Sequence, residues 1–228
     1  MLKNIYNLGD SALYCDFGND VSKEINLNVI KYFQILKNNK IDGITNLAPS
    51  YNKLVITFDL DKINFNEMKD KILNLKLTNV SLGQMKNISI PVCFDDEFSL
   101  DMNRLTNKLN KSKKSIINLL LDNSYFCYMT GFIAGMPFLG DINKSIKMDR
   151  LETPRVNVPK GSIGITEQFC NIYTFDSPGG WNILGKTPLE IFDTSNEKKP
   201  NLIDPGDQVT FYEISKKEFI KKKDEWLF

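Results

Sequence analysis

The chain has 228 residues, of which 42% are hydrophobic, enough for one large domain or two small ones with ordinary buried cores. Its 29 basic and 28 acidic residues leave a net charge of +1, which offers no general attraction to nucleic acid or to an anionic membrane. It contains no histidine, which excludes Ser-His-Asp and Cys-His nucleophile sites, the H-E-x-x-H zinc site and any imidazole general base.

Composition also bears on compartment and redox state. The first residues contain no apolar stretch of signal-peptide length, and no segment approaches the roughly 20 apolar residues that span a bilayer. A cytoplasmic location is therefore expected. The cysteines lie far apart without a C-x-x-C pair, so we expect reduced core residues rather than a zinc or dithiol site. They are Cys15, Cys93, Cys127 and Cys170.

The first third of the chain alternates strand and helix patterns. The predicted strands cover residues 11–17, 41–47, 53–59 and 88–94. Apolar residues at helical spacing predict one helix after the candidate cap Asp20 and a second helix capped near Asn66. The resulting order, β-α-β-β-α-β, is that of a ferredoxin-like unit. We therefore predict a ferredoxin-like α+β domain at residues 1–85.

The remainder of the chain, residues 86–228, has a different pattern of apolar and turn-forming residues. Residues 99–123 predict two helical stretches, and a terminal helix is expected at 215–228. From Tyr125 onward, short apolar runs alternate with glycine and proline, which is typical of a β-barrel or sandwich. The predicted fold class is α+β, with a barrel domain following the first domain.

One short segment matches the nucleotide-binding P-loop pattern. In SPGGWNILGKTP (177–188), Gly180 is followed by four residues and then by Gly185, Lys186 and Thr187. A true P-loop lies between a buried strand and a long helix, and its backbone wraps the phosphates closely. The bulk of Trp181 and the polar turn residues soon after Thr187 disfavour both features. We therefore interpret the match as accidental.

A series of motifs carries a family resemblance. They are GFIAGMPFLG (131–140), TPRVNVPKGSIGI (153–165), SPGGWNILGKTPLEIFD (177–193) and PGDQVTF (205–211), preceded by LGDSALYCDFG (8–18), APSYNKLVITFD (48–59) and IPVCFDDEFSLDM (90–102). Through them the chain resembles the family that contains the 5-oxoprolinase B subunit (PxpB), the sporulation kinase inhibitor KipI and allophanate hydrolase subunit 1. The resemblance implies an N-terminal α/β domain and a cyclophilin-like β-barrel.

The resemblance also implies a function. The leading expectation is a subunit of the ATP-dependent amidohydrolase that opens 5-oxoproline (pyroglutamate) to glutamate. Its partners would be a sister cyclophilin-like subunit (PxpC-type) and a LamB/YcsF-type subunit (PxpA-type), with the ATP site not assigned to this chain and no metal site evident. The alternatives are a KipI-like inhibitor that binds a histidine kinase and a protein of allophanate breakdown. Neither nucleic acid nor a membrane is expected as a partner.

Several residues of these motifs are candidates to face substrate or partner. Arg155, one of three arginines among the 29 basic residues, suits a carboxylate or phosphoryl group by its bidentate fork, or else pairs with Glu152 or Asp149. Trp181 would form an apolar wall or belong to the core, and the glycines would permit close backbone approach or serve turns. The full set is Gly131, Phe132, Gly135, Arg155, Tyr173, Ser177, Gly179, Gly180, Trp181, Lys186 and Thr187. No catalytic acid or base is assigned.

The chain also departs from the family pattern. Lys186 stands where arginine is common and would be a surface charge, and Asn171 replaces a glycine at a turn that asparagine tolerates. A family histidine falls near Leu120, and a family glutamine aligns with Phe169. Ala134, Met136 and Phe138 occupy variable points of the first glycine-rich motif. The apolar residues at Leu120 and Phe169 favour the non-catalytic, kinase-binding alternative.

Overall fold

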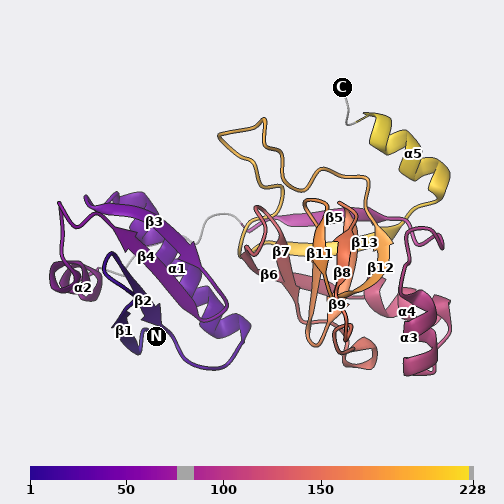
Figure 1. The fold of residues 1–228 in the computed structure, drawn as a ribbon, viewed down its shortest axis with the longest axis horizontal. Coiled ribbons are helices and arrows are strands. Elements are labelled where there is room, and N and C mark those ends of the chain that lie inside the picture. Colours follow the sequence, from indigo (N-terminus) through magenta and orange to yellow (C-terminus); the bar gives the residue numbers. More distant parts are fainter. Residues whose placement is uncertain (76–84, 226–228) are drawn as a thin grey trace. The chain divides into compact units, whose positions relative to one another are not determined.

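The computed structural model describes residues 1–75 and 85–225, which fall into two compact units, Met1–Met85 and Lys86–Phe228 (Figure 1). The helices are α1 (Lys23–Asn39), α2 (Phe65–Leu73), α3 (Met102–Leu109), α4 (Lys113–Leu121), the 3-10 turn η1 (Lys144–Ile146) and α5 (Lys216–Glu225). The strands of the first unit are β1 (Asn4–Asn7), β2 (Ala12–Asp16), β3 (Ile44–Pro49) and β4 (Lys53–Phe58). Those of the second are β5 (Asn87–Val92), β6 (Ser124–Thr130), β7 (Pro137–Gly140), β8 (Arg155–Val158), β9 (Ser162–Thr166), β10 (Phe169–Ile172), β11 (Ser177–Gly179), β12 (Asn182–Lys186) and β13 (Gln208–Glu213).

The first unit is an antiparallel sheet in the order β1-β2-β4-β3, packed against α1 and α2. Alternate residues of β2 and β4 face the core, as strand periodicity requires, so that Leu13 and Cys15 lie beside Leu54 and Ile56 with no exposed surface. Helix α1 adds the apolar stripe that contains Val29. The sheet and the helices that enclose this small core therefore both come from residues 1–75.

Both helices of the first unit begin slightly away from the predicted caps. The side chain of Ser22, rather than Asp20, accepts a hydrogen bond from the Ile25 backbone at the start of α1. Helix α2 begins after Asn64 instead of near Asn66, because Asn64 and Glu67 form a reciprocal capping box. A side-chain acceptor three residues before a free backbone N–H therefore decides each start.

The ferredoxin-like arrangement is not confirmed. The strand predicted at 88–94 is β5, and it pairs with β13 in the second unit. The edge position beside β2 is taken instead by β1, a short strand that the sequence patterns did not predict. A hairpin partner immediately before β2 in the chain closes a short loop, whereas β5 finds a partner more than a hundred residues later.

The second unit is a mixed fold built on a curled sheet in the order β12-β9-β10-β7-β6-β13-β5. Its neighbours pair antiparallel except for β13 and β5, which are parallel. The two edge strands approach one another where Cys93 and Lys186 form an antiparallel bridge, with N···O distances of 2.8 and 3.0 Å. The sheet thus curls far enough for its two ends to meet at one point.

The predicted pair of helices is confirmed as α3 and α4, and both contribute to the core enclosed by this sheet. Leu105 of α3 and Ile116 and Leu120 of α4 are fully buried in the same cluster as the sheet residues Ile90 and Ile163. The predicted terminal helix is confirmed as α5, where Phe219 contacts the Phe98 ring at a centroid distance of 4.6 Å. Within residues 1–75 and 85–225, no helix has both the length and the apolar character required to cross a bilayer.

The four cysteines are free and buried, which confirms that they are core residues. Burial raises the pKa of the Cys15 thiol to about 12 and also raises the pKa of Cys93, Cys127 and Cys170. Because the thiolate is the nucleophile, native protein is expected to react only slowly with iodoacetamide at neutral pH. Protein unfolded in urea is expected to take up one label per cysteine. Intact mass after timed alkylation checks this, and fast labelling of the native chain would contradict it.

Candidate functional site

A two-stranded ribbon, formed by β8 and β11, gathers several of the sequence-predicted site residues. The strands pair antiparallel, with Ser177 opposite Val158 and Gly179 opposite Arg155, and the register shifts between these pairs. The Ser177 hydroxyl oxygen is buried and has no hydrogen-bond partner among the described residues. The ribbon therefore brings Arg155, Ser177 and Gly179 together, as the motif spacing suggested.

Arg155 is held by an acid that the sequence reasoning did not consider. Its Nη2 lies 2.6 Å from Oδ1 of Asp101, while Oδ2 of Asp101 accepts a hydrogen bond from the Ile183 backbone at 2.7 Å. The Asp101 side chain is only 5% exposed and that of Arg155 27%. The alternative in which Arg155 pairs with Glu152 or Asp149 is wrong, because its ion pair is with Asp101, which ties β8 to β12.

Tyr173 lies directly beneath the glycines of the ribbon. It is 2% exposed, and a Cβ added at Gly179 would overlap its hydroxyl group. Burial raises the pKa of the Tyr173 phenol, although a hydrogen bond with the Asn171 side chain and the positive charge of Arg150 oppose the rise. The phenol is therefore protonated at neutral pH. The close approach of backbone to ring explains why glycine is required at 179.

Arg150, in the loop that precedes β8, lies beside Gly180 in the turn between β11 and β12. A Cβ added at Gly180 would lie 3.4 Å from Nη2 of Arg150, and the Leu151 backbone donates to the Gly180 carbonyl at 2.7 Å. Arg150 is exposed, and in the part of the chain that the structure describes it forms no ion pair. Its guanidinium group is thus available for an anion beside the turn.

The loop between β6 and β7 contains the other glycines of the prediction. Gly131 donates to the Met136 carbonyl at 3.0 Å, and the Thr174 hydroxyl donates to the Ala134 carbonyl at 2.8 Å. Gly135 has a φ of +68°, and a Cβ there would overlap the Phe192 ring. Phe132 has a φ of +66° and is 79% exposed. These contacts fix the loop in a conformation in which the Phe132 side chain is exposed to solvent.

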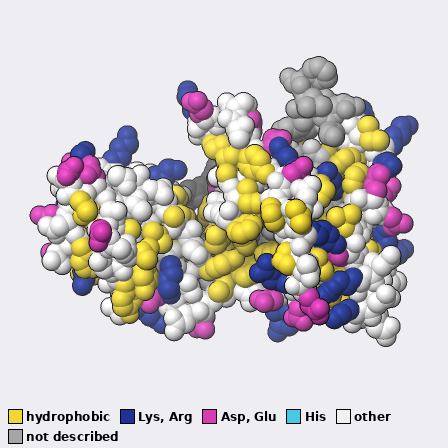
Figure 2. All heavy atoms as spheres, in the orientation of Figure 1, with side chains coloured by type: hydrophobic (Ala, Val, Ile, Leu, Met, Phe, Trp, Pro, Cys, Tyr) yellow, Lys and Arg dark blue, Asp and Glu magenta, His cyan; other side chains and the backbone are white. Residues whose placement is uncertain are grey.

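An apolar surface surrounds this loop and ribbon. Val156 of β8 is 88% exposed, and the half-buried Trp181 packs edge-on against Phe138 with ring centroids 5.6 Å apart. Figure 2 shows hydrophobic side chains gathered on the face of the second unit over which β6, β7, β8 and β11 lie, with basic side chains beside them. Exposed apolar surface of this kind marks an interaction site more often than a free surface.

Lys186 and Thr187 lie apart from the turn, at the far end of β12 from Trp181. Lys186 bridges to Cys93 and places its ammonium group 6.0 Å from the centre of the Phe98 ring. Thr187 is 2% exposed, and its backbone donates to Gly161 at 2.9 Å. The P-loop segment forms strands β11 and β12, and no helix follows within residues 188–215. The interpretation of the P-loop match as accidental is confirmed.

Two residues of this site were missed. Asp101 lies in the IPVCFDDEFSLDM motif, but its partner Arg155 is 54 positions away, so spacing could not connect them. Arg150 carried a usable signal, because arginine is rare in this chain and resists replacement where a planar fork is needed. In the described ranges, no group of three or more metal-binding side chains is found.

Residues 3–203 match the sequence model of the family described as "Carboxyltransferase domain, subdomain C and D". The chain therefore belongs to this family. Its curled second-unit sheet is consistent with the cyclophilin-like fold implied by the sequence resemblance.

Individual relatives extend this result. The chain is 30% identical to a 5-oxoprolinase B subunit of Bacillus subtilis (strain 168), over 97% of this chain and 97% of that protein. It is 21% identical to the urea amidolyase of Saccharomyces cerevisiae, over 95% of this chain and 14% of that protein. The crystal structure of TTHA0988 has a TM-score of 0.81 and 27% identity, and covers 90% of this chain, which spans 40% of that longer chain. The region thus exists both as a chain of this length and within longer proteins.

Proposed function

We propose that this chain is a subunit of an ATP-dependent 5-oxoprolinase that opens 5-oxo-L-proline to L-glutamate together with partner subunits. The observation that carries the proposal is the likeness to the Bacillus subtilis 5-oxoprolinase B subunit along 97% of both chains. The partners would be a sister cyclophilin-like subunit and a LamB/YcsF-type subunit. ATP would serve the complex, at a site not assigned to this chain.

The geometry of the ribbon supports a binding role for this subunit. Arg150 could bind the substrate carboxylate through its planar fork, because the absence of a side chain at Gly180 leaves room for close approach. Trp181 would bound the ligand on its apolar side. Arg155 is already engaged by Asp101 and would position β8 instead of binding substrate.

The exposed apolar surface supports a role in a complex. Phe132 and Val156 are among the most exposed large hydrophobic residues of the second unit, at 79% and 88%. Burying such residues against a second protein contributes favourable free energy, roughly 25 cal/mol for each Å² of apolar area removed from water. We propose that this surface contacts the sister subunit. Arg150 and the turn at Gly180 would then lie at a site shared by the two subunits.

The test is co-expression with both proposed partners, with assembly verified by size-exclusion chromatography, followed by measurement of glutamate released from 5-oxoproline. Release is expected only with all subunits and ATP present. Arg150→Lys retains the charge but loses the fork, and is expected to raise KM for 5-oxoproline about tenfold. Arg104→Lys, the same change at a half-buried arginine of α3 outside the ribbon, is expected to leave KM unchanged. An assembled complex that releases no glutamate would refute the proposal.

A second candidate is a KipI-like protein that binds a sensor histidine kinase and performs no chemistry. Two positions favour it. Leu120 is fully buried in the core, and Phe169 packs edge-on against Tyr128 with centroids 5.6 Å apart, so neither offers a polar group. Inhibition of purified-kinase autophosphorylation by this chain, combined with a catalytically silent assembled complex, would support this candidate.

A further inference from the structure

The free edge of β3 is a feature of the first unit that the proposed function does not use. This strand ends the sheet order β1-β2-β4-β3, and among the described strands it pairs with β4 alone. Within residues 1–75 and 85–225, the backbone N–H and C=O groups that alternate along its outer edge therefore have no strand partner. A register shift between Ile44 and Asn46, and Pro49 at the other end, limit the usable edge to the middle of the strand.

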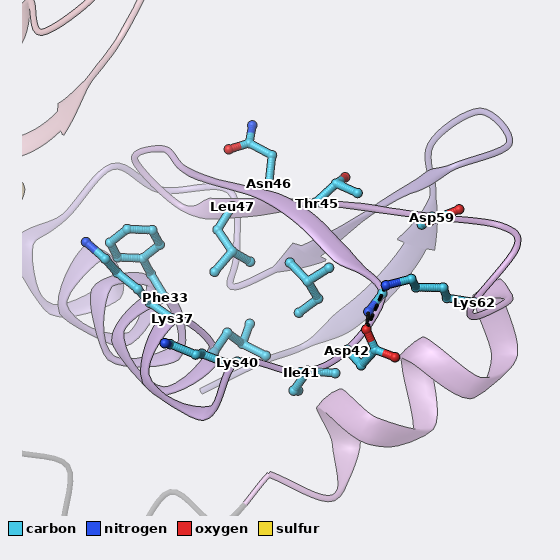
Figure 3. Close-up of a pocket in the computed structure, with 13 residues that line it drawn as sticks. Phe33, Lys37, Lys40, Ile41, Asp42, Thr45, Asn46, Leu47, Asp59 and Lys62 are labelled. Atoms are coloured by element: carbon cyan, nitrogen blue, oxygen red, sulfur yellow. Dashed lines mark hydrogen bonds and ion pairs between the residues drawn. The ribbon is translucent and has the colours of Figure 1, made fainter. Parts of the chain in front are cut away.

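A groove of about 580 Å³ lies between this edge and the last turns of α1 (Figure 3). Phe33 and Leu36 of α1 line it on one side, and Ile44 and Leu47 of β3 on the other. Figure 3 shows Leu47 directed into the groove, while Asn46 points away from it. A groove with apolar side chains among its polar lining, next to a free strand edge, can bind the main chain and alternate side chains of one extended segment.

The charges along the groove are unequal. At its α1 end, Lys37 and Lys40 make no ion pair within the described residues, and Lys37 lies 5.7 Å from the centre of the Phe33 ring. At the other end, Lys62 is neutralised by Asp42 at 3.1 Å (Figure 3). Asp59 adds a negative charge at the Lys62 end, so the positive charge of the groove is concentrated at the α1 end, where it favours an occupant with acidic side chains.

We propose that this groove binds an extended, acidic segment of a partner protein, which adds to the sheet as a new strand along β3. The segment would place apolar side chains at alternate positions against Phe33 and Leu47, and carboxylates near Lys37 and Lys40. A small carboxylate would leave the strand edge unused.

The test uses the full chain and a short fluorescent peptide in which valine and glutamate alternate along one face of the strand and serine occupies the other face (Val-Ser-Glu-Ser-Val-Ser-Glu), with binding measured by fluorescence anisotropy. Wild-type protein is expected to bind this peptide, and Lys37→Glu/Lys40→Glu to bind it about tenfold more weakly. A lysine-valine peptide should show the opposite preference. The matched control is Lys69→Glu on α2, compared with Lys37→Glu alone, because each of these helix lysines lies over an aromatic ring, Phe65 for Lys69 and Phe33 for Lys37. This control should bind like wild type.

Two further measurements examine the strand pairing itself. Methylating alternate backbone nitrogens of the peptide should abolish binding when the methylated edge faces β3, because the backbone donors are lost. Amide hydrogen exchange at residues 45–48 should slow on binding. No binding of the acidic peptide, equal binding by both lysine variants, or displacement by free glutamate at equal concentration would overturn the proposal. None of these outcomes depends on 5-oxoprolinase activity, so the two proposals can fail separately.

Discussion

Replacing Asp101 by alanine is expected to lower the free energy of unfolding of the second unit by about 3 kcal/mol. The change leaves the Arg155 guanidinium without the carboxylate at 2.6 Å and the Ile183 backbone N–H without its acceptor at 2.7 Å. Ile183 is fully buried and the Arg155 side chain is only 27% exposed, so water replaces the lost partners at most in part. Urea unfolding followed by tryptophan fluorescence measures the effect, since Trp181 belongs to the second unit.

The matched control is Asp96→Ala. Asp96 pairs with Lys113 at 2.7 Å, almost the same distance, but its side chain is 97% exposed. Water solvates both charges once the pair is broken, so the expected loss is much smaller than that of Asp101→Ala. Similar losses for the two variants would show that burial of the Asp101 pair does not contribute as argued.

Gly179→Ala is expected to destabilise the second unit by about 2 kcal/mol and to weaken substrate binding by the assembled complex. The added methyl group would overlap the Tyr173 hydroxyl, and Tyr173 is held among Met136, Val158 and Ile183 with 2% of its surface exposed. Either the ribbon or the ring must therefore move, which would shift the turn at Gly180 beside which Arg150 lies. Unfolding in urea measures the first effect, and KM for 5-oxoproline measures the second.

Two companion variants make this prediction specific. Gly180→Ala should change the free energy of unfolding by less than about 0.5 kcal/mol, because its new Cβ would meet Arg150 at 3.4 Å, an ordinary contact. Tyr173→Phe added to Gly179→Ala should recover part of the loss, since the overlapping oxygen is removed while the ring carbon Cζ remains 2.8 Å away. A Gly180→Ala effect as large as that of Gly179→Ala would contradict the overlap with Tyr173.

Local patterns predicted most of the elements well. The paired helices α3 and α4 follow from apolar spacing, and the texture of short runs between glycine and proline indicated the strand-rich second unit. The P-loop match could be rejected from the residues around it, because Trp181 and the lack of a following helical pattern conflict with phosphate wrapping. Such features depend on neighbours a few positions apart, and the sequence displays those neighbours directly.

These local patterns could not predict which segments distant in sequence pair with one another. The strand at 88–94 has the same apolar content whether it completes the first unit or joins the second, and only its partner Phe211, aligned with Ile90, distinguishes the two cases. Arg155 likewise had nearby acids in Glu152 and Asp149, but the geometry of the ribbon places it against Asp101. An opposite charge that is near in sequence does not predict an ion pair, because the backbone decides in which direction the side chain points.

By itself the sequence determined the class of elements, the absence of histidine chemistry and the family to which the motifs belong. Only the tertiary structure decided which acid holds Arg155, which arginine remains available beside Gly180, and where apolar side chains stay exposed. The physical reason is that helices and strands depend on the period of nearby side chains, whereas a site depends on contacts between segments distant in sequence. Those contacts form only when the sheet curls and brings the segments together.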